Sequence, residues 1–138
     1  MRKKQIILEI AGGLIILLFT YASLSKLLAF RHFIQALNNQ PLPKAWTLPL
    51  AYGILTAEIT TIMMLVIPSS RKWGFVLATL VMLMFTSYTS IILLHTFSYI
   101  PCSCGGVVEL LSWKQHLVLN VLFLAVSILG SRLSFQEQ

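Results

Sequence analysis

The two cysteines of the chain, Cys102 and Cys104, lie two residues apart in the run PCSCGG at residues 101–106. In an extended chain this spacing puts the α-carbons near the upper limit for a disulfide, so a turn must bring the sulfurs together. Gly105 supplies the backbone freedom for such a turn. So small a ring restrains the unfolded chain little, and strain in it raises the reduction potential and speeds exchange. The pair is therefore predicted to be a working disulfide rather than a structural staple.

A helix is expected to follow these cysteines. Residues 107–114 have helical character, which would place Cys104 before a helix N-terminus, where the helix dipole stabilises a thiolate. Trp113, His116 and Asn120 follow at spacings of three and four, so they share one helix face that begins beside the cysteines. His116 can exchange a proton with a thiol, and Asn120 can hold a ligand head group or a neighbouring helix. Trp113 and Gln115 are supporting candidates, and ordinary helix packing is the alternative for this face.

Two other interpretations of the cysteines stay open. They can be inert thiols or a passive surface disulfide. Cys102, Cys104, His95 and His116 also have the donor types of a tetrahedral zinc site, but their spacing matches no common zinc finger. We therefore assign no metal ligands, and a metal site is kept only as an alternative.

An isolated acid and a nearby lysine form the second candidate group. Glu58 falls near the middle of an apolar segment, where a charged residue costs about 3 kcal/mol on insertion scales. It must be neutral, paired or facing a polar cavity, and Lys26, near the end of the preceding apolar block, is its candidate partner. The carboxyl then either handles protons or orients a ligand, or the pair is a structural tie between helices.

The elements that position these residues are expected to be membrane spans. The chain has 138 residues, of which 57% are hydrophobic and only 10% charged, against roughly 25% charged residues in soluble domains. Apolar blocks at about residues 6–28, 48–67, 73–97 and 116–133 are each near the roughly 20 residues of a span. We predict an all-α integral membrane protein, with residues 1–138 forming a single four-helix domain. The first block exceeds the roughly 7–15 residues of a signal-peptide core and is expected to stay uncleaved.

Charge sets the expected orientation. Cytoplasmic loops carry the excess of Lys and Arg. Placing both termini in the cytoplasm puts six basic residues on that side and four outside; the inner set is Arg2, Lys3, Lys4, Arg71, Lys72 and Arg132, and the outer set is Lys26, Arg31, Lys44 and Lys114. The net charge of +6 is scattered rather than gathered in a stripe, so nucleic acid is not an expected partner.

Two outer loops follow from this orientation. The cysteine loop, residues 98–115, would face the periplasm from a bacterial cytoplasmic membrane, where disulfides are permitted. In the other, residues 29–47, Phe30, Phe33, Ile34 and Leu37 recur at helical spacing and predict a short amphipathic helix on the membrane interface.

The chain resembles the MauE and DoxX-like group of small redox-associated membrane proteins. The likeness covers residues 23–33 with Lys26, 49–65 with Glu58, 101–106, and then Trp113, Gln115, His116 and Asn120, in this order on four spans. It implies a four-helix bundle that acts in thiol and disulfide chemistry, often beside a thioredoxin-like extracytoplasmic partner, including maturation of disulfide-rich proteins. The DsbB and vitamin K epoxide reductase groups are similar in helix count and cysteine use, but they relay electrons through more than one cysteine pair.

Three hypotheses follow. The leading one is a membrane-embedded thiol-disulfide redox protein in which Cys102 and Cys104 exchange with a thioredoxin-like protein and His116 manages protons. A quinone would be the natural two-electron partner, although the sequence has no quinone motif. The second is a non-enzymatic assembly subunit of a larger membrane complex, and the third is a heavy-metal carrier or sensor.

Overall fold

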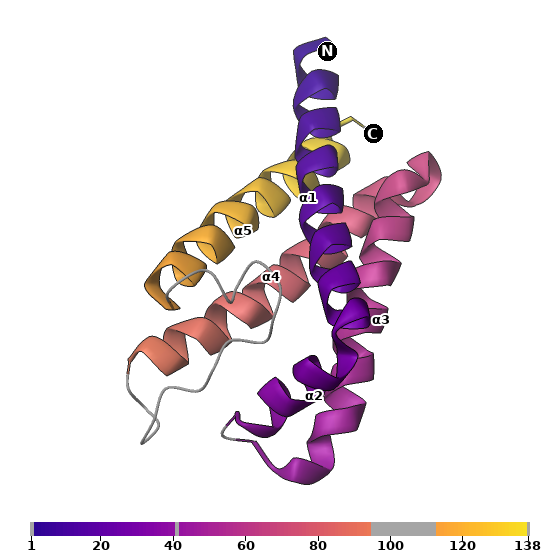
Figure 1. Cartoon of the computed structure of the whole chain (residues 1–138). Coiled ribbons are helices and arrows are strands. Elements are labelled where there is room, and N and C mark those ends of the chain that lie inside the picture. The colour runs from indigo at the N-terminus through magenta and orange to yellow at the C-terminus, as the bar shows by residue number, and fades with distance from the viewer. Residues whose placement is uncertain (1, 41, 95–112, 138) are drawn as a thin grey trace.

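The computed structural model describes residues 2–40, 42–94 and 113–137, and these residues form helices and no strand (Figure 1). The elements are α1 (Arg2–Leu28), α2 (Phe30–Asn38), the short 3-10 helix η1 (Lys44–Trp46), α3 (Thr47–Val66), the 3-10 helix η2 (Pro68–Ser70), α4 (Arg71–Leu93) and α5 (Trp113–Gln136). Four helical segments are long and apolar enough to cross a membrane: Arg2–Leu28, Lys44–Val66, Pro68–Ile91 and Lys114–Gln136. This confirms the predicted all-helical, multi-pass membrane architecture. Residues 95–97, at the end of the predicted third span, lie outside the described residues.

Proline sets the turn between α3 and α4. The residue before a proline is pushed out of the helical region of backbone space, and Ile67 is extended with φ −82° and ψ 116°. Pro68 then begins η2, where its fixed φ suits the first helical position. The turn is so short that α3 and α4 must be antiparallel neighbours.

The four long helices pack in a ring. Helix α1 contacts α3 and α5, and α4 contacts the same two helices, so α1 and α4 lie across the bundle from each other. Both termini lie at one end (Figure 1). There Lys4 Nζ donates to Gln136 Oε1 at 3.5 Å, and Lys72 Nζ lies 5.8 Å from the ring centroid of Phe135.

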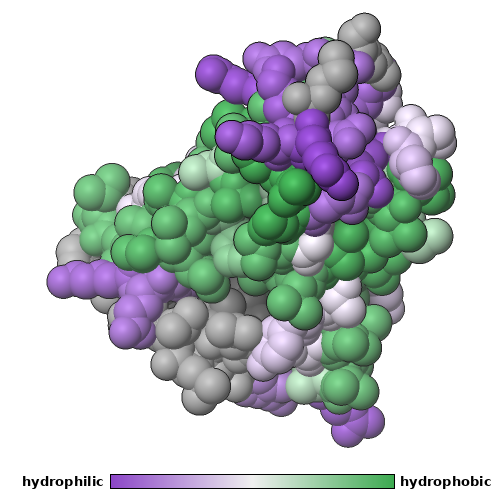
Figure 2. All heavy atoms as spheres, turned by 90° about the horizontal axis from the view of Figure 1, so that it is seen from above, coloured by the Kyte–Doolittle hydropathy of each residue, from purple (hydrophilic) through white to green (hydrophobic). Residues whose placement is uncertain are grey.

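This end of the bundle brings together the basic residues that charge counting assigned to the cytoplasm. The view onto it shows hydrophilic side chains gathered in one region beside hydrophobic flanks (Figure 2). The beginnings of α1 and α4 and the last turns of α5 therefore share one side of the protein. Which side of the membrane this is stays a prediction.

The main core lies in the half of the bundle nearer this end. Ile15 and Phe19 of α1 pack with Leu65 of α3 and with Phe75 and Met82 of α4 in one buried cluster. Close packing of α4 on α5 depends on Gly130, because a β-carbon there would overlap the buried Phe75 ring. Apolar residues on the outer faces of the spans remain exposed, as suits a lipid solvent; Leu17, Leu80 and Val118 are examples.

Helix α2 lies in the stretch where a short amphipathic helix was predicted. Phe33 and Leu37 are buried in a second core cluster with Ala51 and Leu55 of α3. The apolar face of α2 therefore covers α3. That this helix lies at the membrane interface stays a prediction. An apolar face gains more dispersion contact against a shaped protein surface than against lipid alone.

Four serine and threonine hydroxyls in α4 donate to their own helix. Thr79, Thr86, Thr89 and Ser90 each donate to the carbonyl oxygen four residues earlier, at 2.6 to 2.8 Å. Ser127 of α5 does the same at 2.8 Å. These hydroxyls are thus satisfied without a neighbouring helix.

Candidate functional site

The predicted partners Lys26 and Glu58 are paired in the structure. Lys26 Nζ, in the last turn of α1, lies 2.7 Å from Glu58 Oε1, near the middle of α3. Ser23 is three residues before Lys26, so it shares that face of α1, and its Oγ donates to Glu58 Oε2 at 2.9 Å. The Glu58 side chain is only 1% exposed, and both of its carboxylate oxygens accept a hydrogen bond. Lys26 Nζ also lies 5.8 Å from the centroid of the Phe33 ring on α2, within cation–π range.

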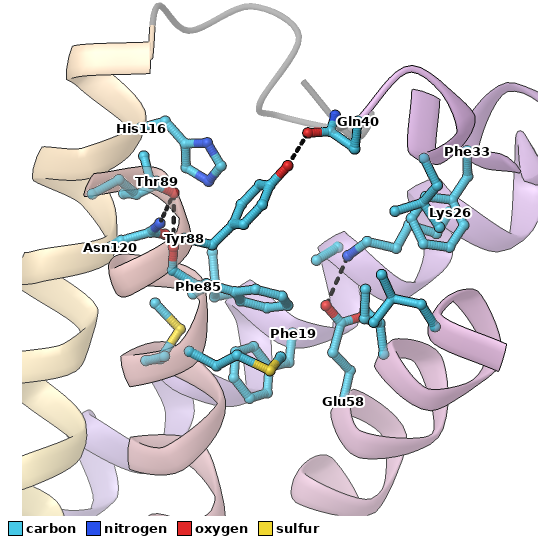
Figure 3. A pocket seen from close by; sticks show the side chains of 18 of the residues that line it. Phe19, Lys26, Phe33, Gln40, Glu58, Phe85, Tyr88, Thr89, His116 and Asn120 are labelled. Carbon is cyan, nitrogen blue, oxygen red and sulfur yellow. Dashed lines mark hydrogen bonds and ion pairs between the residues drawn. The ribbon is translucent and has the colours of Figure 1, made fainter. Parts of the chain in front are cut away.

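Helices α4 and α5 carry a second polar group. Asn120 is buried, and its Nδ2 donates to Thr89 Oγ1 at 3.2 Å. His116 lies one turn before Asn120 on the same face of α5 and is partly buried. Two of the three residues that the sequence placed on one face, His116 and Asn120, therefore point to the same side of α5 (Figure 3). Gln115 is exposed, and Trp113 is the first residue of α5.

A third polar contact joins the two sides of the bundle. The Tyr88 hydroxyl of α4 donates to Gln40 Oε1, just after α2, in a contact visible in Figure 3. Gln40 Nε2 in turn donates to the Ala36 carbonyl oxygen at 3.2 Å. Sequence reasoning missed Gln40 and Tyr88. The available signal was a tyrosine inside an apolar span, which needs a hydrogen-bond partner when it is buried.

These groups surround a cavity of about 270 Å³ between α1, α2 and α3 on one side and α4 and α5 on the other. In Figure 3 Lys26, Glu58 and Phe33 lie on one wall, and Tyr88, Thr89, Asn120 and His116 lie on the other. The remaining walls are mainly apolar. The lining residues are Leu18, Phe19, Tyr21, Ala22, Lys26, Phe33, Leu37, Gln40, Leu42, Leu50, Ile54, Glu58, Met82, Met84, Phe85, Tyr88, Thr89, His116, Leu119 and Asn120. The structure thus brings Lys26, Glu58, His116 and Asn120 to one cavity.

Cys102, Cys104, Gly105 and His95 lie outside the described residues. Their segment of chain joins Leu94, after α4, to Trp113 at the start of α5. His116 follows Trp113 by one helical turn, so the cavity residue nearest in sequence to the cysteines is also the predicted proton carrier. Within residues 2–40, 42–94 and 113–137, no group of three or more His, Cys, Asp or Glu side chains can hold a metal ion.

Comparison with known proteins gives one family. The family model described as "Methylamine utilisation protein MauE" matches residues 4–133, which include nearly all of the four spans and the whole cysteine segment. No curated protein and no solved structure matches the chain.

Proposed function

We propose that this chain, which belongs to the MauE family of membrane proteins, is a membrane-embedded thiol-disulfide redox protein that exchanges electrons with an extracytoplasmic thioredoxin-like partner. One observation carries the proposal: the only two cysteines of the chain form a Cys-Ser-Cys run in the segment that leads into α5. The family match supports a common origin of this segment and the four spans. The name of the family links it to methylamine utilisation, which makes a protein-maturation role in that process the favoured setting.

The proposed exchange follows ordinary thiol chemistry. A thiolate of Cys102 or Cys104 attacks one sulfur of the partner's disulfide, forming a mixed disulfide and releasing the other partner sulfur as a thiolate that takes up a proton. The second cysteine then loses its proton and attacks the mixed disulfide. This leaves a disulfide in the chain and a dithiol in the partner, and the reverse sequence transfers the electrons the other way. We assign His116 the transfer of these protons, since it lines the cavity and is the lining residue nearest in sequence to the cysteines.

The exchange requires the cysteine loop to face the periplasm from a bacterial cytoplasmic membrane. The basic residues at the terminal end of the bundle support this orientation, because cytoplasmic ends of spans carry the excess of Lys and Arg. The compartment outside that membrane permits disulfides.

The test is to trap the mixed disulfide with single cysteine variants. Cys104→Ser leaves Cys102 as the only thiol, and Cys102→Ser leaves Cys104. We expect one variant to give a higher-mass band on non-reducing gels that reductant removes, and the other to give much less, because only one thiol makes the first attack. From the sequence, Cys102 is expected to be the more accessible thiol because it precedes the expected turn, whereas Cys104 is expected to be better stabilised as a thiolate because it is nearer the helix start. These two expectations favour different cysteines, so we predict only that the two variants differ.

The double variant Cys102→Ser/Cys104→Ser is the matched control and must give no such band. The exchange mechanism should be abandoned for the assembly role if neither single variant traps a partner and the wild-type pair keeps one redox state under mild oxidant and mild reductant. Under the assembly role the double variant would keep the biological activity.

A further inference from the structure

The cavity has the composition of a small-molecule site: mostly apolar walls with a few polar groups. Its volume of about 270 Å³ is just below the roughly 300–1,000 Å³ of such sites, which suits one ring-sized head group. Tyr21 on α1 and Met84 on α4 line it and are 48% and 49% exposed. The cavity therefore opens on the outside of the bundle, so that an apolar tail can extend into lipid.

The charges of the lining favour a neutral ligand. Lys26 and Glu58 together carry no net charge, wherever the proton between them lies. An anionic head group would have to compete with Glu58 for Lys26, and a cationic one would be repelled by Lys26 at close range. Fatty acids and phospholipid phosphates are thus poor matches for this cavity.

The polar groups favour a ligand that accepts hydrogen bonds. The ammonium of Lys26 has three N–H donors and gives one to Glu58 Oε1. On the opposite wall, the Asn120 amide has two N–H donors and gives one to Thr89 Oγ1. Both walls of the cavity can therefore offer a donor to an acceptor between them.

We infer that this cavity binds the head group of a membrane quinone, a flat, neutral ring with a carbonyl oxygen at each end. Lys26 would donate to it from one wall and Asn120 from the other, with the tail leaving past Tyr21 and Met84. The choice of a quinone among neutral carbonyl lipids rests on the proposed function. When bound, a quinone supplies an acceptor for two electrons and two protons, which is what two thiols release when they form a disulfide.

Binding is measured on the purified full chain in detergent, with decylubiquinone as the probe and oleate as the anionic comparison. We expect the wild-type chain to retain decylubiquinone stoichiometrically after chromatography, as measured by solvent extraction, and its unfolding temperature to rise with probe concentration. Oleate should give neither result. Equal retention of oleate, or no retention of decylubiquinone, would overturn the inference.

Two substitutions on α1 locate the site. Ala22 lines the cavity, so Ala22→Phe should fill it and lower affinity for decylubiquinone by at least about tenfold, or about 1.4 kcal/mol. Gly13 is exposed on the same helix, and a β-carbon there meets nothing within 4 Å. Gly13→Phe therefore adds the same ring outside the cavity and should bind the probe as the wild type does. Equal affinity in the Ala22→Phe variant would place the quinone elsewhere.

Two further variants test the site without filling the cavity and distinguish quinone binding from thiol-disulfide exchange. Lys26→Met/Glu58→Leu keeps an apolar cavity but removes one donor, and it should also weaken binding about tenfold or more; unchanged affinity would exclude Lys26 as a ligand contact. The variant Cys102→Ser/Cys104→Ser should retain the quinone fully. Quinone binding without partner trapping would refute the proposed function alone, and trapping without quinone binding would refute this inference alone.

Discussion

Removing one partner of the buried ion pair should cost more stability than replacing both partners, and removing Lys26 should cost the most. Lys26→Met leaves the Glu58 carboxylate, 1% exposed, with only the Ser23 hydroxyl of its two present donors. Removing one partner of a buried pair typically costs about 3–5 kcal/mol, and this burial places Lys26→Met in that range. Glu58→Leu should cost less, about 1–3 kcal/mol, because Lys26 lies near the helix end, is 11% exposed and can extend its amine toward the interface.

The double variant Lys26→Met/Glu58→Leu should lie within about 1 kcal/mol of the wild type, since apolar residues of similar volume remove both desolvation costs. The expected coupling energy between the two sites is therefore more than about 3 kcal/mol. The assay is the free energy of unfolding in mixed micelles during titration with dodecyl sulfate, followed by circular dichroism. Recovery in the membrane fraction checks insertion, which Glu58→Leu should preserve because it removes an intramembrane acid.

The exposed pair of Glu9 and Arg71 is the matched control. The Glu9 side chain is 67% exposed, so Glu9→Gln should cost less than about 1 kcal/mol. Two results would contradict this prediction. In the first, the losses in free energy of unfolding of the two single variants at Lys26 and Glu58 add up to the loss of the double variant. In the second, Lys26→Met loses no more free energy of unfolding than Glu9→Gln. Either result would mean that water or lipid head groups already screen the buried pair.

Three more predictions concern packing and topology. Gly130→Ala should destabilise the bundle by about 1–3 kcal/mol, because the added methyl group overlaps the Phe75 ring. Gly53→Ala is the control and should not destabilise the bundle, since a β-carbon at Gly53 meets open space. Equal unfolding midpoints for the two variants would contradict the close packing of α4 on α5. Thr89→Val should lower the free energy of unfolding by about 0.6 kcal/mol, the usual value of a hydrogen bond between membrane helices. If Thr89 and Asn120 act only on each other, adding Asn120→Leu to this variant should lower the free energy of unfolding little further. A thiol reagent that cannot cross membranes should label the reduced cysteine pair in intact spheroplasts, and a C-terminal reporter should be cytoplasmic; labelling only after lysis together with an external reporter would reverse the orientation.

The parts of the fold that follow from composition could be predicted from the sequence. Four apolar segments of span length leave few alternatives to four helices, and proline at position 68 locates the turn between α3 and α4. Lys26 and Glu58 were visible as isolated charges in apolar surroundings, which must find partners. His116 and Asn120 were visible because helical spacing puts them on one face.

The cavity and the hydrogen bond between Tyr88 and Gln40 were not predictable in this way. Tyr88 and Gln40 are 48 residues apart, and their contact depends on how α2 and α4 sit in the bundle, which no local pattern encodes. The same holds for the burial of Phe33, since its spacing marks an apolar helix face but not what covers that face. The cavity itself depends on the distance between helices α1, α2 and α3 on one side and α4 and α5 on the other. Residue types alone do not set that distance.

The hydroxyl groups of α4 bear on how the chain is made. Four hydroxyl groups of α4 donate to carbonyl oxygens of their own helix: those of Thr79, Thr86, Thr89 and Ser90. Helix α4 can therefore leave the translocon before another helix is present, because these hydroxyls need no partner on another helix. Helix α3 differs, because Glu58 enters lipid at a cost of about 3 kcal/mol unless Lys26 is beside it. During synthesis, insertion of α3 therefore costs less if α1 is still near the translocon when α3 emerges. The pair of α1 and α3 is then the first intermediate, on which α4 and α5 assemble.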